Sequence, residues 1–390
     1  MINPAPLRIL HTESSMELGG QEFRILAEAV GMRGRGHFVV LAVQPHSQIA
    51  VQARAAGIPV ELVRMGCGRI LPLVSQFQRI IETYRIDVVN THGSLDSWVA
   101  SVAARWSSVK PAIVRTRHKS TPIVRSWRHY ILYRMLPHAV VTTGEAIRTH
   151  LIRDHGIHPD HVVSIPTGVD VSLFSPNQAL SIRMDHEATP SDFVVGTVSF
   201  LRDYKGLNIL IAAAQQVVAV YPHVKFWIIG EGPERSQLEQ MITEFGLQHH
   251  VVLCGFQTEI PRWLSRVDVF VMPSTGAEGI PQALTQALAM ERPVVASSVG
   301  GIPEVVEHGI TGLLVPPNDP DSLAKALLLL LRDSVLRKTL GRAGRQRVVE
   351  ELSMTRMLEK TEELYYRLLE VRGTESSRTP PAITMTSMGD

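Results

Sequence analysis

The sequence has 390 residues, 45% hydrophobic and 19% charged, which is long enough for two domains that each bury a core. Its net charge of +2 argues neither for nor against nucleic acid, and its two cysteines, Cys67 and Cys254, do not suggest a disulfide framework or a cysteine-rich metal site. The longest apolar run, Ala326–Leu331, is too short to span a bilayer, and the first residues lack the pattern of a signal peptide. We therefore expect a soluble cytoplasmic protein, or one that rests on a membrane surface.

Short β-branched runs alternate with longer amphipathic segments along the chain. In the first half these runs are residues 8–12, 38–43, 60–63, 87–92, 112–117, 139–144 and 162–166. In the second half they are residues 193–199, 224–230, 251–255, 267–273, 293–298 and 312–317. Apolar strands separated by helical segments are typical of parallel sheets covered by helices. Two such series predict an α/β protein with two doubly wound, Rossmann-like domains.

A polar, proline-bounded stretch without clear periodicity separates the two series. We therefore predict a first domain over residues 1–175, a linker over 176–192 and a second domain over 193–352. A last helical pattern covers residues 353–372. The remaining residues, 373–390, have the Ser, Thr and Pro content of a disordered tail.

Glycine, histidine and charged residues gather where the predicted strands end. In the first half Gly20 follows the first strand, His92 ends the fourth, and Arg117 and His118 end the fifth. In the second half the segments 200–206, 230–233 and 276–279 follow three strands in the same way. Doubly wound sheets bind ligands at the carboxyl ends of their strands. Two domains whose carboxyl ends face each other would form a substrate cleft between them.

The first loop of the second half has the features of an anion site. Arg202 and Lys205 stand three residues apart, and Gly206 gives the backbone room to turn. An arginine can bind two phosphate oxygens while a lysine acts as a point charge, so this pair could hold a diphosphate. The alternative is two solvated cations on a loop.

The segment 276–290 places polar residues at helical spacing. Glu278, Gln282 and Gln286 are four apart and predict a polar ridge that begins at a helix N-terminus, a place that favours anions. The opposite face, which should pack, holds Ala283, Leu284, Ala287 and Leu288. A carboxylate would repel phosphate, so we expect Glu278 to hold sugar hydroxyls and Gln286 a ribose hydroxyl. A solvated helix face with one acid is the simpler alternative.

Other segments of the sequence could support other chemistry. His92 could bond a sugar hydroxyl or the reacting oxygen, although a structural role is commoner for a lone histidine. Residues 318–321 resemble an acidic metal site but fit helix capping better. The chain has no dinucleotide-binding or P-loop glycine motif after a strand. The basic and aromatic stretch 115–134 could rest on anionic lipid, and a solvated helix face is the alternative; nucleic acid is not expected.

Taken together, these motifs resemble the retaining glycosyltransferases of family four, which have the two-domain GT-B fold. The resemblance runs from GGQE (19–22) through NTHGSLDSW (90–98), FLRDYKG (200–206) and GEGPE (230–234) to the segment 268–319, and covers about residues 7–370. It implies that the last helix, 353–372, crosses back to the first domain. It also implies that no metal or other cofactor is needed, because Arg and Lys neutralise the leaving diphosphate.

The resemblance assigns roles to individual residues. Donor-binding residues would be Gly20, Arg202, Lys205, Glu278, Gly279, Ile280 and Gln286. The groups that act in catalysis would be His92, Arg202, Lys205 and Glu278, and the acceptor-side residues would be His92, Arg117 and His118. The family's second motif glutamate is replaced by Gln286, a variant that resembles bacterial lipopolysaccharide and capsule transferases.

The implied activity is metal-independent, hexosyltransferase-type transfer of a sugar from a nucleoside-diphosphate donor, expected to be a UDP-sugar. The acceptor would be a saccharide or a lipid-linked saccharide in lipopolysaccharide, capsule or exopolysaccharide synthesis, at the inner face of the membrane. Two alternatives stay open. One is a nucleotide-sugar epimerase or hydrolase on the same fold, and the other is an inactive nucleotide-sugar-binding protein.

Overall fold

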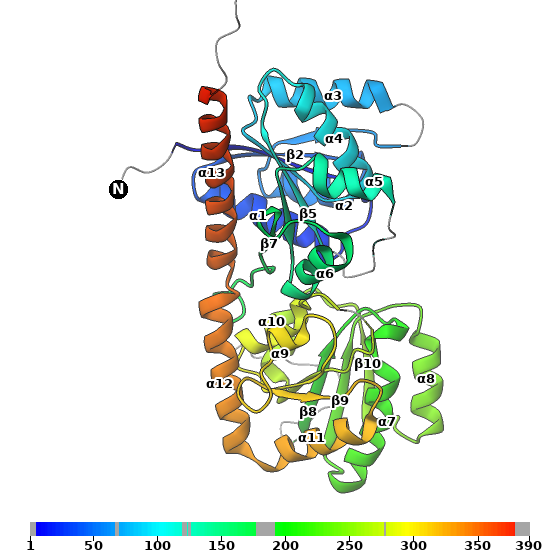
Figure 1. Cartoon of the computed structure of the whole chain (residues 1–390). Coiled ribbons are helices and arrows are strands. Elements are labelled where there is room, and N and C mark those ends of the chain that lie inside the picture. Colours follow the sequence, from blue (N-terminus) through cyan, green and yellow to red (C-terminus); the bar gives the residue numbers. More distant parts are fainter. Residues whose placement is uncertain are drawn as a thin grey trace, which may run out of the picture. The chain divides into compact units, whose positions relative to one another are not determined.

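The structure is a computed structural model that describes residues 5–66, 70–118, 123, 126–176, 192–276 and 278–378, with side chains through residue 372. Two parallel sheets organise it, and all thirteen predicted strand segments form strands (Figure 1). Cys67 and nearly all of the predicted linker, residues 177–191, lie outside the described residues.

The first sheet has seven strands in the order β3-β2-β1-β4-β5-β6-β7. The pairings among β1 to β5 are all parallel. The strands are β1 (Arg8–Glu13), β2 (Phe38–Val43), β3 (Val60–Leu62), β4 (Val88–Thr91), β5 (Ala112–Arg117), β6 (Ala139–Thr142) and β7 (Val162–Ser164). The helical segments between them are α1 (Gly20–Gly34), α2 (Gln48–Ala55), α3 (Ile70–Thr83), α4 (Ser94–Trp106), α5 (Trp127–Tyr130), the π-helical turn η1 (Ile131–Met135), α6 (Glu145–His155) and the short η2 (Pro159–His161).

The second sheet has six strands in the order β10-β9-β8-β11-β12-β13, and every neighbouring pair is parallel. Its strands are β8 (Phe193–Val198), β9 (Val224–Ile229), β10 (Val251–Gly255), β11 (Val269–Met272), β12 (Val294–Ser297) and β13 (Leu313–Val315). The helical segments are η3 (Asp203–Lys205), α7 (Leu207–Val220), α8 (Arg235–Glu244), α9 (Ile260–Arg266), α10 (Gln282–Ala289), η4 (Ile302–Glu304), α11 (Pro320–Arg332) and α12 (Ser334–Glu351). These orders confirm the predicted pair of doubly wound α/β sheets.

The order reverses direction beside β1 in one sheet and beside β8 in the other. After β1 the chain adds β2 and β3 on one side and then returns to the other side with β4. The second sheet repeats this pattern around β8, with β9 and β10 on one side and β11 on the other. In doubly wound sheets ligands bind at such switch points, outside the carboxyl ends of the strands. The loops after β1, β4, β8 and β11 are therefore where the structure favours a site.

The chain divides into two compact units, but not at the predicted linker. The first unit holds the chain to Thr116, residues 125–141 and the chain from Leu358 onward, and the second holds residues 117–124 and 142–357. The stretch after Thr142 therefore groups with the second unit. One reason is backbone pairing, because the Val169 amide donates to the Leu352 carbonyl at 2.9 Å and the Met354 amide donates to the Val169 carbonyl at 2.8 Å.

The C-terminal helix α13 (Met354–Arg378) belongs to the first unit from Leu358 onward. It lies beside α1, where a Cβ added to Gly31 would come within 2.4 Å of the Leu358 side chain. Glu362 accepts from Arg35 at 2.6 Å and pairs with His37 at 2.8 Å, and both partners belong to the same unit. The helix continues past the predicted end at Arg372, so the predicted tail begins six residues too early; residues 379–390 lie outside the described residues. No helix among the described residues combines the length and apolar character needed to cross a bilayer.

Candidate functional site

The loop after β8 turns tightly at Gly206. Arg202 precedes the short helix η3, Lys205 ends it, and Gly206 adopts a left-handed conformation (φ 66°) before α7 begins. A Cβ on Gly206 would lie 2.0 Å from the carbonyl oxygen of Pro273, so only glycine fits where this loop meets the loop after β11. The sequence prediction of a glycine turn beside two cations is therefore correct.

The loops after β8 and β11 join through Lys205 and Glu278. The Lys205 ammonium donates to Glu278 Oε1 at 2.5 Å, and the Ser274 hydroxyl donates to the same oxygen at 2.9 Å. The Lys205 and Glu278 side chains are only 15% and 11% exposed, so the pair is poorly screened by water. The backbone joins the same loops, since the Thr275 amide donates to the Tyr204 carbonyl at 2.8 Å. The carboxylate and ammonium thus hold each other at the carboxyl ends of β8 and β11.

A third loop, after β12, packs under Glu278. Gly300 is left-handed (φ 55°), and a Cβ there would lie 2.2 Å from the carbonyl oxygen of Glu278. The Gly301 amide donates to that carbonyl at 3.0 Å. The loop after β12 therefore fixes the backbone of Glu278, and this loop tolerates no side chain at Gly300. Such support is what a positioned carboxylate needs.

The predicted polar ridge is wrong for its first member. Glu278 lies in a loop, and α10 begins only at Gln282, directly after Pro281. A proline disfavours helical backbone in the residue before it, so the helix does not extend back through Ile280 to Glu278. Gln282 and Gln286 do share the half-buried side of α10. The predicted packing face is confirmed at Leu284, Ala287 and Leu288, whereas Ala283 is only half-buried.

The other proposed donor residues of the second unit lie in the loops after β8 and β11 and in α10, and among the described residues their side chains form no hydrogen bond to this pair. Arg202 is exposed, and its guanidinium carbon stands 4.9 Å above the Phe200 ring. Gly279 and Ile280 follow Glu278 in the same loop, and both are half-buried. Gln286 lies one turn into α10. The structure therefore joins Lys205 to Glu278 and leaves the Arg202 guanidinium facing solvent beside an aromatic ring.

Another acid of the second unit, Glu304, caps helix α6. Its two carboxylate oxygens accept from the backbone amides of Glu145 and Ala146, both at 2.6 Å. A carboxylate at a helix N-terminus satisfies free amides and complements the helix dipole. This anion position was not predicted from the sequence.

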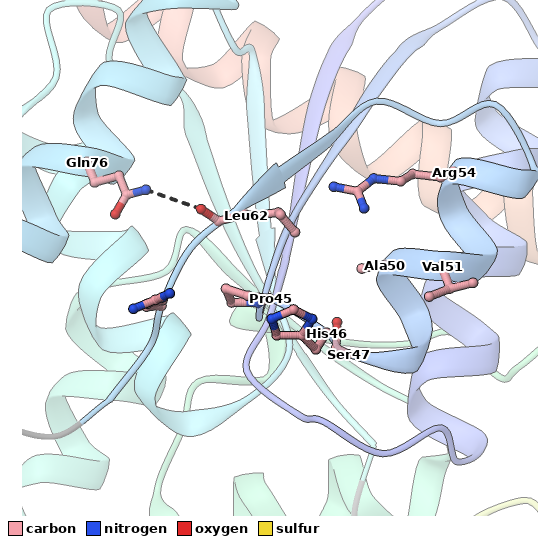
Figure 2. A pocket seen from close by; sticks show the side chains of 9 residues that line it. Pro45, His46, Ser47, Ala50, Val51, Arg54, Leu62 and Gln76 are labelled. Atoms are coloured by element: carbon pink, nitrogen blue, oxygen red, sulfur yellow. Dashed lines mark hydrogen bonds between the residues drawn. The ribbon is translucent and has the colours of Figure 1, made fainter.

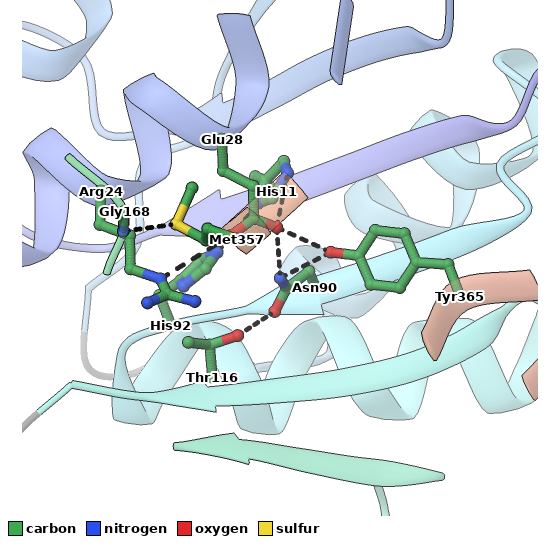
Figure 3. A network of polar contacts seen from close by, with 9 residues as sticks. All are labelled: His11, Arg24, Glu28, Asn90, His92, Thr116, Gly168, Met357 and Tyr365. Atoms are coloured by element: carbon green, nitrogen blue, oxygen red, sulfur yellow. Dashed lines mark hydrogen bonds and ion pairs between the residues drawn. The ribbon is translucent and has the colours of Figure 1, made fainter. Parts of the chain in front are cut away.

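In the first unit, His92 is buried against a second histidine (Figure 3). His92 Nε2 lies 3.0 Å from His11 Nδ1, and the two rings stack with centroids 5.3 Å apart. His11 comes from β1 and His92 directly follows β4, so the pair sits at the switch point of the first sheet. Burial lowers the pKa of His11, so this ring is neutral near neutral pH. One of the two facing nitrogens therefore donates and the other accepts.

Behind His11 lies a buried polar network centred on Glu28 of α1 (Figure 3). Glu28 Oε1 is 3.9 Å from His11 Nε2 and accepts from the hydroxyl of Tyr365 at 2.9 Å. The other carboxylate oxygen is 3.9 Å from the Arg24 guanidinium. Asn90 donates to Tyr365 at 2.9 Å and to Glu28 at 3.3 Å. Since Tyr365 belongs to α13, the network connects the C-terminal helix with the histidine pair.

Two acids are buried here: Glu13 is the last residue of β1, and Asp96 lies in the first turn of α4. Asp96 accepts from the Thr12 hydroxyl at 2.8 Å and from the backbone amide of His92 at 3.1 Å, so it fixes the loop that carries His92. Glu13 accepts from the Ser15 amide at 2.8 Å and also from the Gln21 side chain. Burial, and then the negative charge of Asp96, raise the pKa of Glu13 from 4.5 to about 7.

The raised pKa of Glu13 predicts how stability changes with pH. Between the pKa of the unfolded chain and that of the folded chain, the folded state holds a proton that the unfolded state has released, so stability falls as pH rises through this window. Relative to the wild type, the variant Glu13→Gln should therefore gain about 3 kcal/mol of unfolding free energy between about pH 5 and pH 8. Urea unfolding of both proteins at several pH values measures this difference, and the comparison cancels the titration of His11. A difference that stays constant with pH would contradict the assignment.

The remaining proposed residues of the first half occupy plainer surroundings. Gly20 begins α1, is exposed, and would have no neighbour within 4 Å of an added Cβ, so nothing in its surroundings requires glycine. Arg117 ends β5 and His118 follows it; both are half-buried, and both group with the second unit. Within the described part of the chain, no three His, Cys, Asp or Glu side chains gather as a metal site.

Comparisons with known proteins agree with this arrangement of two domains. Residues 18–173 match the family described as Glycosyltransferase Family 4, and residues 192–333 match the family described as Glycosyl transferases group 1. Together the two matches span most of both sheets.

Among curated relatives, a UDP-Gal:alpha-D-GlcNAc-diphosphoundecaprenol alpha-1,3-galactosyltransferase of Escherichia coli is 26% identical over 76% of this chain and 81% of its own length. A putative colanic acid biosynthesis glycosyltransferase, WcaL, of Escherichia coli K12 is 38% identical over 41% of this chain and 39% of its own. Among solved structures, a glycosyltransferase from Rickettsia africae has a TM-score of 0.86 at 20% identity, covering 94% of this chain and 99% of that chain. The Anabaena protein HepE, solved in complex with UDP, has a TM-score of 0.79 at 23% identity, covering 95% and 100%.

Proposed function

Since the chain belongs to glycosyltransferase family four, we propose that it transfers a sugar from a UDP-sugar to a lipid-linked saccharide during bacterial cell-surface polysaccharide synthesis. The observation that carries the proposal is the pair of half-buried Lys205 and buried Glu278 at the switch point of the second sheet. The choice of donor and acceptor is supported by the Escherichia coli relative, whose name gives UDP-galactose and a diphosphoundecaprenol-linked sugar.

The loops after β8 and β11 supply the groups that a nucleotide-sugar needs. Lys205 and Arg202 would hold the diphosphate, with Arg202 presenting the planar fork that suits phosphate oxygens. The second carboxylate oxygen of Glu278 would accept hydrogen bonds from sugar hydroxyls. The backbone amides of Gly279 and Ile280 would donate hydrogen bonds to the same sugar. Because Glu278 already neutralises Lys205, the arriving phosphate would share the ammonium with the carboxylate, and the pair keeps both groups in place beforehand.

On the first sheet, His92 would act beside the reacting sugar. The neighbouring Glu28 carboxylate favours a proton on His11 Nε2, which leaves His11 Nδ1 as the acceptor. His92 Nε2 then carries the donated proton, and its Nδ1 is the nitrogen with a lone pair. In this tautomer His92 would accept a hydrogen bond from a sugar hydroxyl. Gly20 stays a proposed contact of the donor phosphates. Arg117 and His118 stay proposed contacts of the acceptor.

Retention would proceed on one face of the donor sugar. The bond from the anomeric carbon to the diphosphate breaks, the acceptor oxygen forms the new bond, and the departing phosphate oxygen takes the acceptor's proton. The positive groups Arg202 and Lys205 stabilise the charge that develops on the diphosphate, and such preorganised electrostatics is usually the largest catalytic term. No metal is required in this scheme.

Attachment to an anionic membrane surface is the part of the proposal that rests on the stretch 115–134. Within it Trp127 and Tyr130 are 68% and 50% exposed, and the guanidinium groups of Arg128 and Arg134 lie over their rings at 5.5 Å and 5.1 Å. Exposed aromatic and basic side chains together suit a lipid headgroup layer. Arg115 does not contribute, because it is buried and donates to the carbonyl of Gly93 at 2.7 Å.

The experiment that tests the proposed reaction is UDP release from UDP-sugars, with and without a polyprenyl-diphosphate-linked saccharide. A transferase releases UDP only when the acceptor is present and forms a longer lipid-linked saccharide. Release without acceptor at the same rate would favour a hydrolase. No release with any combination would favour an inactive binding protein.

A further inference from the structure

A hollow in the first unit lies at the carboxyl ends of β2 and β3, apart from the histidine pair (Figure 2). Its volume is about 630 Å³. Pro45, His46 and Ser47 follow β2, Ala50, Val51 and Arg54 come from α2, and Leu62, Arg64 and Gln76 complete the lining. The hollow lies on the carboxyl-end side of the sheet, the side on which doubly wound sheets bind ligands, but beside β2 and β3 rather than at the switch point next to β1.

The lining of the hollow is basic. Arg54 and Arg64 are both exposed, and neither guanidinium group forms a hydrogen bond or ion pair with any residue that the structure describes. No aspartate or glutamate lies among the nine lining residues, so the described wall of the hollow holds no acid that neutralises these guanidinium groups. Two arginine side chains without partners line this concave surface and suit a phosphate group, because phosphate oxygens accept hydrogen bonds from guanidinium groups.

Strained backbone marks the same place. His46 adopts a left-handed conformation (φ 64°), which is uncommon for a residue with a side chain and costs about 1 kcal/mol or more. The turn at His46 leads into Ser47, the residue before α2, and both line the hollow. Backbone strain of this kind concentrates at ligand sites, where the surrounding structure maintains it.

The wall of the hollow also carries exposed apolar side chains. Val51 is 65% exposed and Leu62 is 41% exposed. Helix α3, which contributes Gln76, begins with Ile70 and Leu71, which are 62% and 72% exposed. Adjoining basic and apolar surface suits a ligand that has both a phosphate and a hydrocarbon part.

We propose that this hollow binds the phosphate or diphosphate group of the acceptor, with the attached lipid leaving along Val51 and Leu62. The inference rests on the proposed function, because it names the chemical class of the acceptor in the same transfer. Arg54 and Arg64 are then acceptor-binding residues, and Lys205 and Glu278 belong to the donor alone.

The direct test is calorimetric titration of the full chain with inorganic pyrophosphate at low salt. The parent protein carries Arg202→Ala and Lys205→Ala, so that the proposed donor site does not contribute. We expect saturable binding to one site, weakened about tenfold by each of Arg54→Ala and Arg64→Ala, since one charge-assisted hydrogen bond accounts for about that factor. Arg79→Ala is the matched control, because Arg79 is an exposed arginine of α3 outside the hollow. Pyrophosphate binding that survives the Arg54→Ala/Arg64→Ala combination would overturn the proposal.

A flotation experiment distinguishes the possible sources of the phosphate. Phosphatidylcholine vesicles carry either a polyprenyl diphosphate or an equal amount of phosphatidylglycerol. The arginine substitutions should reduce binding to the first vesicles and leave binding to the second unchanged. An equal loss on both would identify a general headgroup contact and overturn the acceptor assignment.

UDP binding separates this inference from the proposed function. The Arg54→Ala/Arg64→Ala protein should be stabilised by UDP as strongly as the wild type, because its donor site is intact. If UDP does not stabilise the wild type, the proposed function is wrong, regardless of whether pyrophosphate binds. If UDP binds and pyrophosphate does not, only the acceptor site is wrong.

Discussion

Replacing Lys205 with alanine should lower turnover by a factor on the order of 10²–10³, the range found when one preorganised donor to a developing charge is removed. Lys205 is the least exposed cation of the proposed donor site, at 15% exposure, and its ammonium lies 2.5 Å from Glu278. Burial of this kind strengthens its interaction with a phosphate. The rate of acceptor-dependent UDP release measures the effect.

A double-substitution cycle with Glu278→Gln separates two ways in which Lys205 could act. If Lys205 binds phosphate directly, the double variant should lose more turnover than either single variant, although the contact between the two residues keeps their effects from multiplying fully. If Lys205 only holds Glu278 in place, the double variant should lose no more than the worse single variant. Lys338→Ala, at an exposed lysine of α12, is the control and should keep full activity. Full activity of Lys205→Ala would remove the phosphate assignment.

Replacing Glu28 with alanine should destabilise the first unit by about 3–5 kcal/mol, the cost of breaking a buried ion pair by removing one partner. Glu28 and Arg24 are each 1% exposed. The substitution removes the carboxylate beside the Arg24 guanidinium and also the acceptor for Tyr365. Urea denaturation, monitored through the unfolding transition of the first unit, measures the loss in the free energy of unfolding.

Glu362→Ala is the matched control for Glu28→Ala. Glu362 also pairs with basic side chains of the first unit, Arg35 and His37, but its side chain is 20% exposed and that of Arg35 is 33% exposed. A pair screened by solvent contributes roughly 0–1 kcal/mol, so the control should lose far less. Equal losses in the two variants would show that the network around Glu28 does not behave as a buried ion pair.

The strands were predictable because each is an apolar run bounded by turn residues. The boundary between the two compact units was not predictable. The residues after Thr142 group with the second unit because of contacts between distant segments, such as the cap that Glu304 gives to α6. The end of α13 was also misjudged, since the Ser, Thr and Pro content of residues 373–390 predicted a tail where the helix continues to Arg378.

The position of the candidate site was predictable where its residues follow strands. Arg202, Lys205, Gly206 and Glu278 all follow strands, and the structure places Lys205 against Glu278. The loop position of Glu278 could have been read from Pro281, which limits how far a helix extends toward its N-terminus. Helical spacing alone was therefore a poor guide there.

The network behind His92 escaped the sequence analysis because its members come from distant segments. His11, Glu28 and Tyr365 lie on β1, α1 and α13 and meet only in the folded first unit. One signal was present in the sequence. His11 and Glu13 are polar residues in a strand that the pattern predicts to be buried, and burial requires that they find partners.

The central claim, that the second sheet carries a nucleotide-sugar site built on Lys205, is tested most directly by thermal stabilisation with UDP, GDP, ADP and CMP. A bound ligand at about 100 times its Kd stabilises a protein by roughly 2.7 kcal/mol. We expect a clear shift with UDP, a smaller one with UDP in Gln286→Ala, and none in Lys205→Ala. If none of the four nucleotides stabilises the wild type, or if Lys205→Ala responds to UDP as the wild type does, the donor site is wrongly placed.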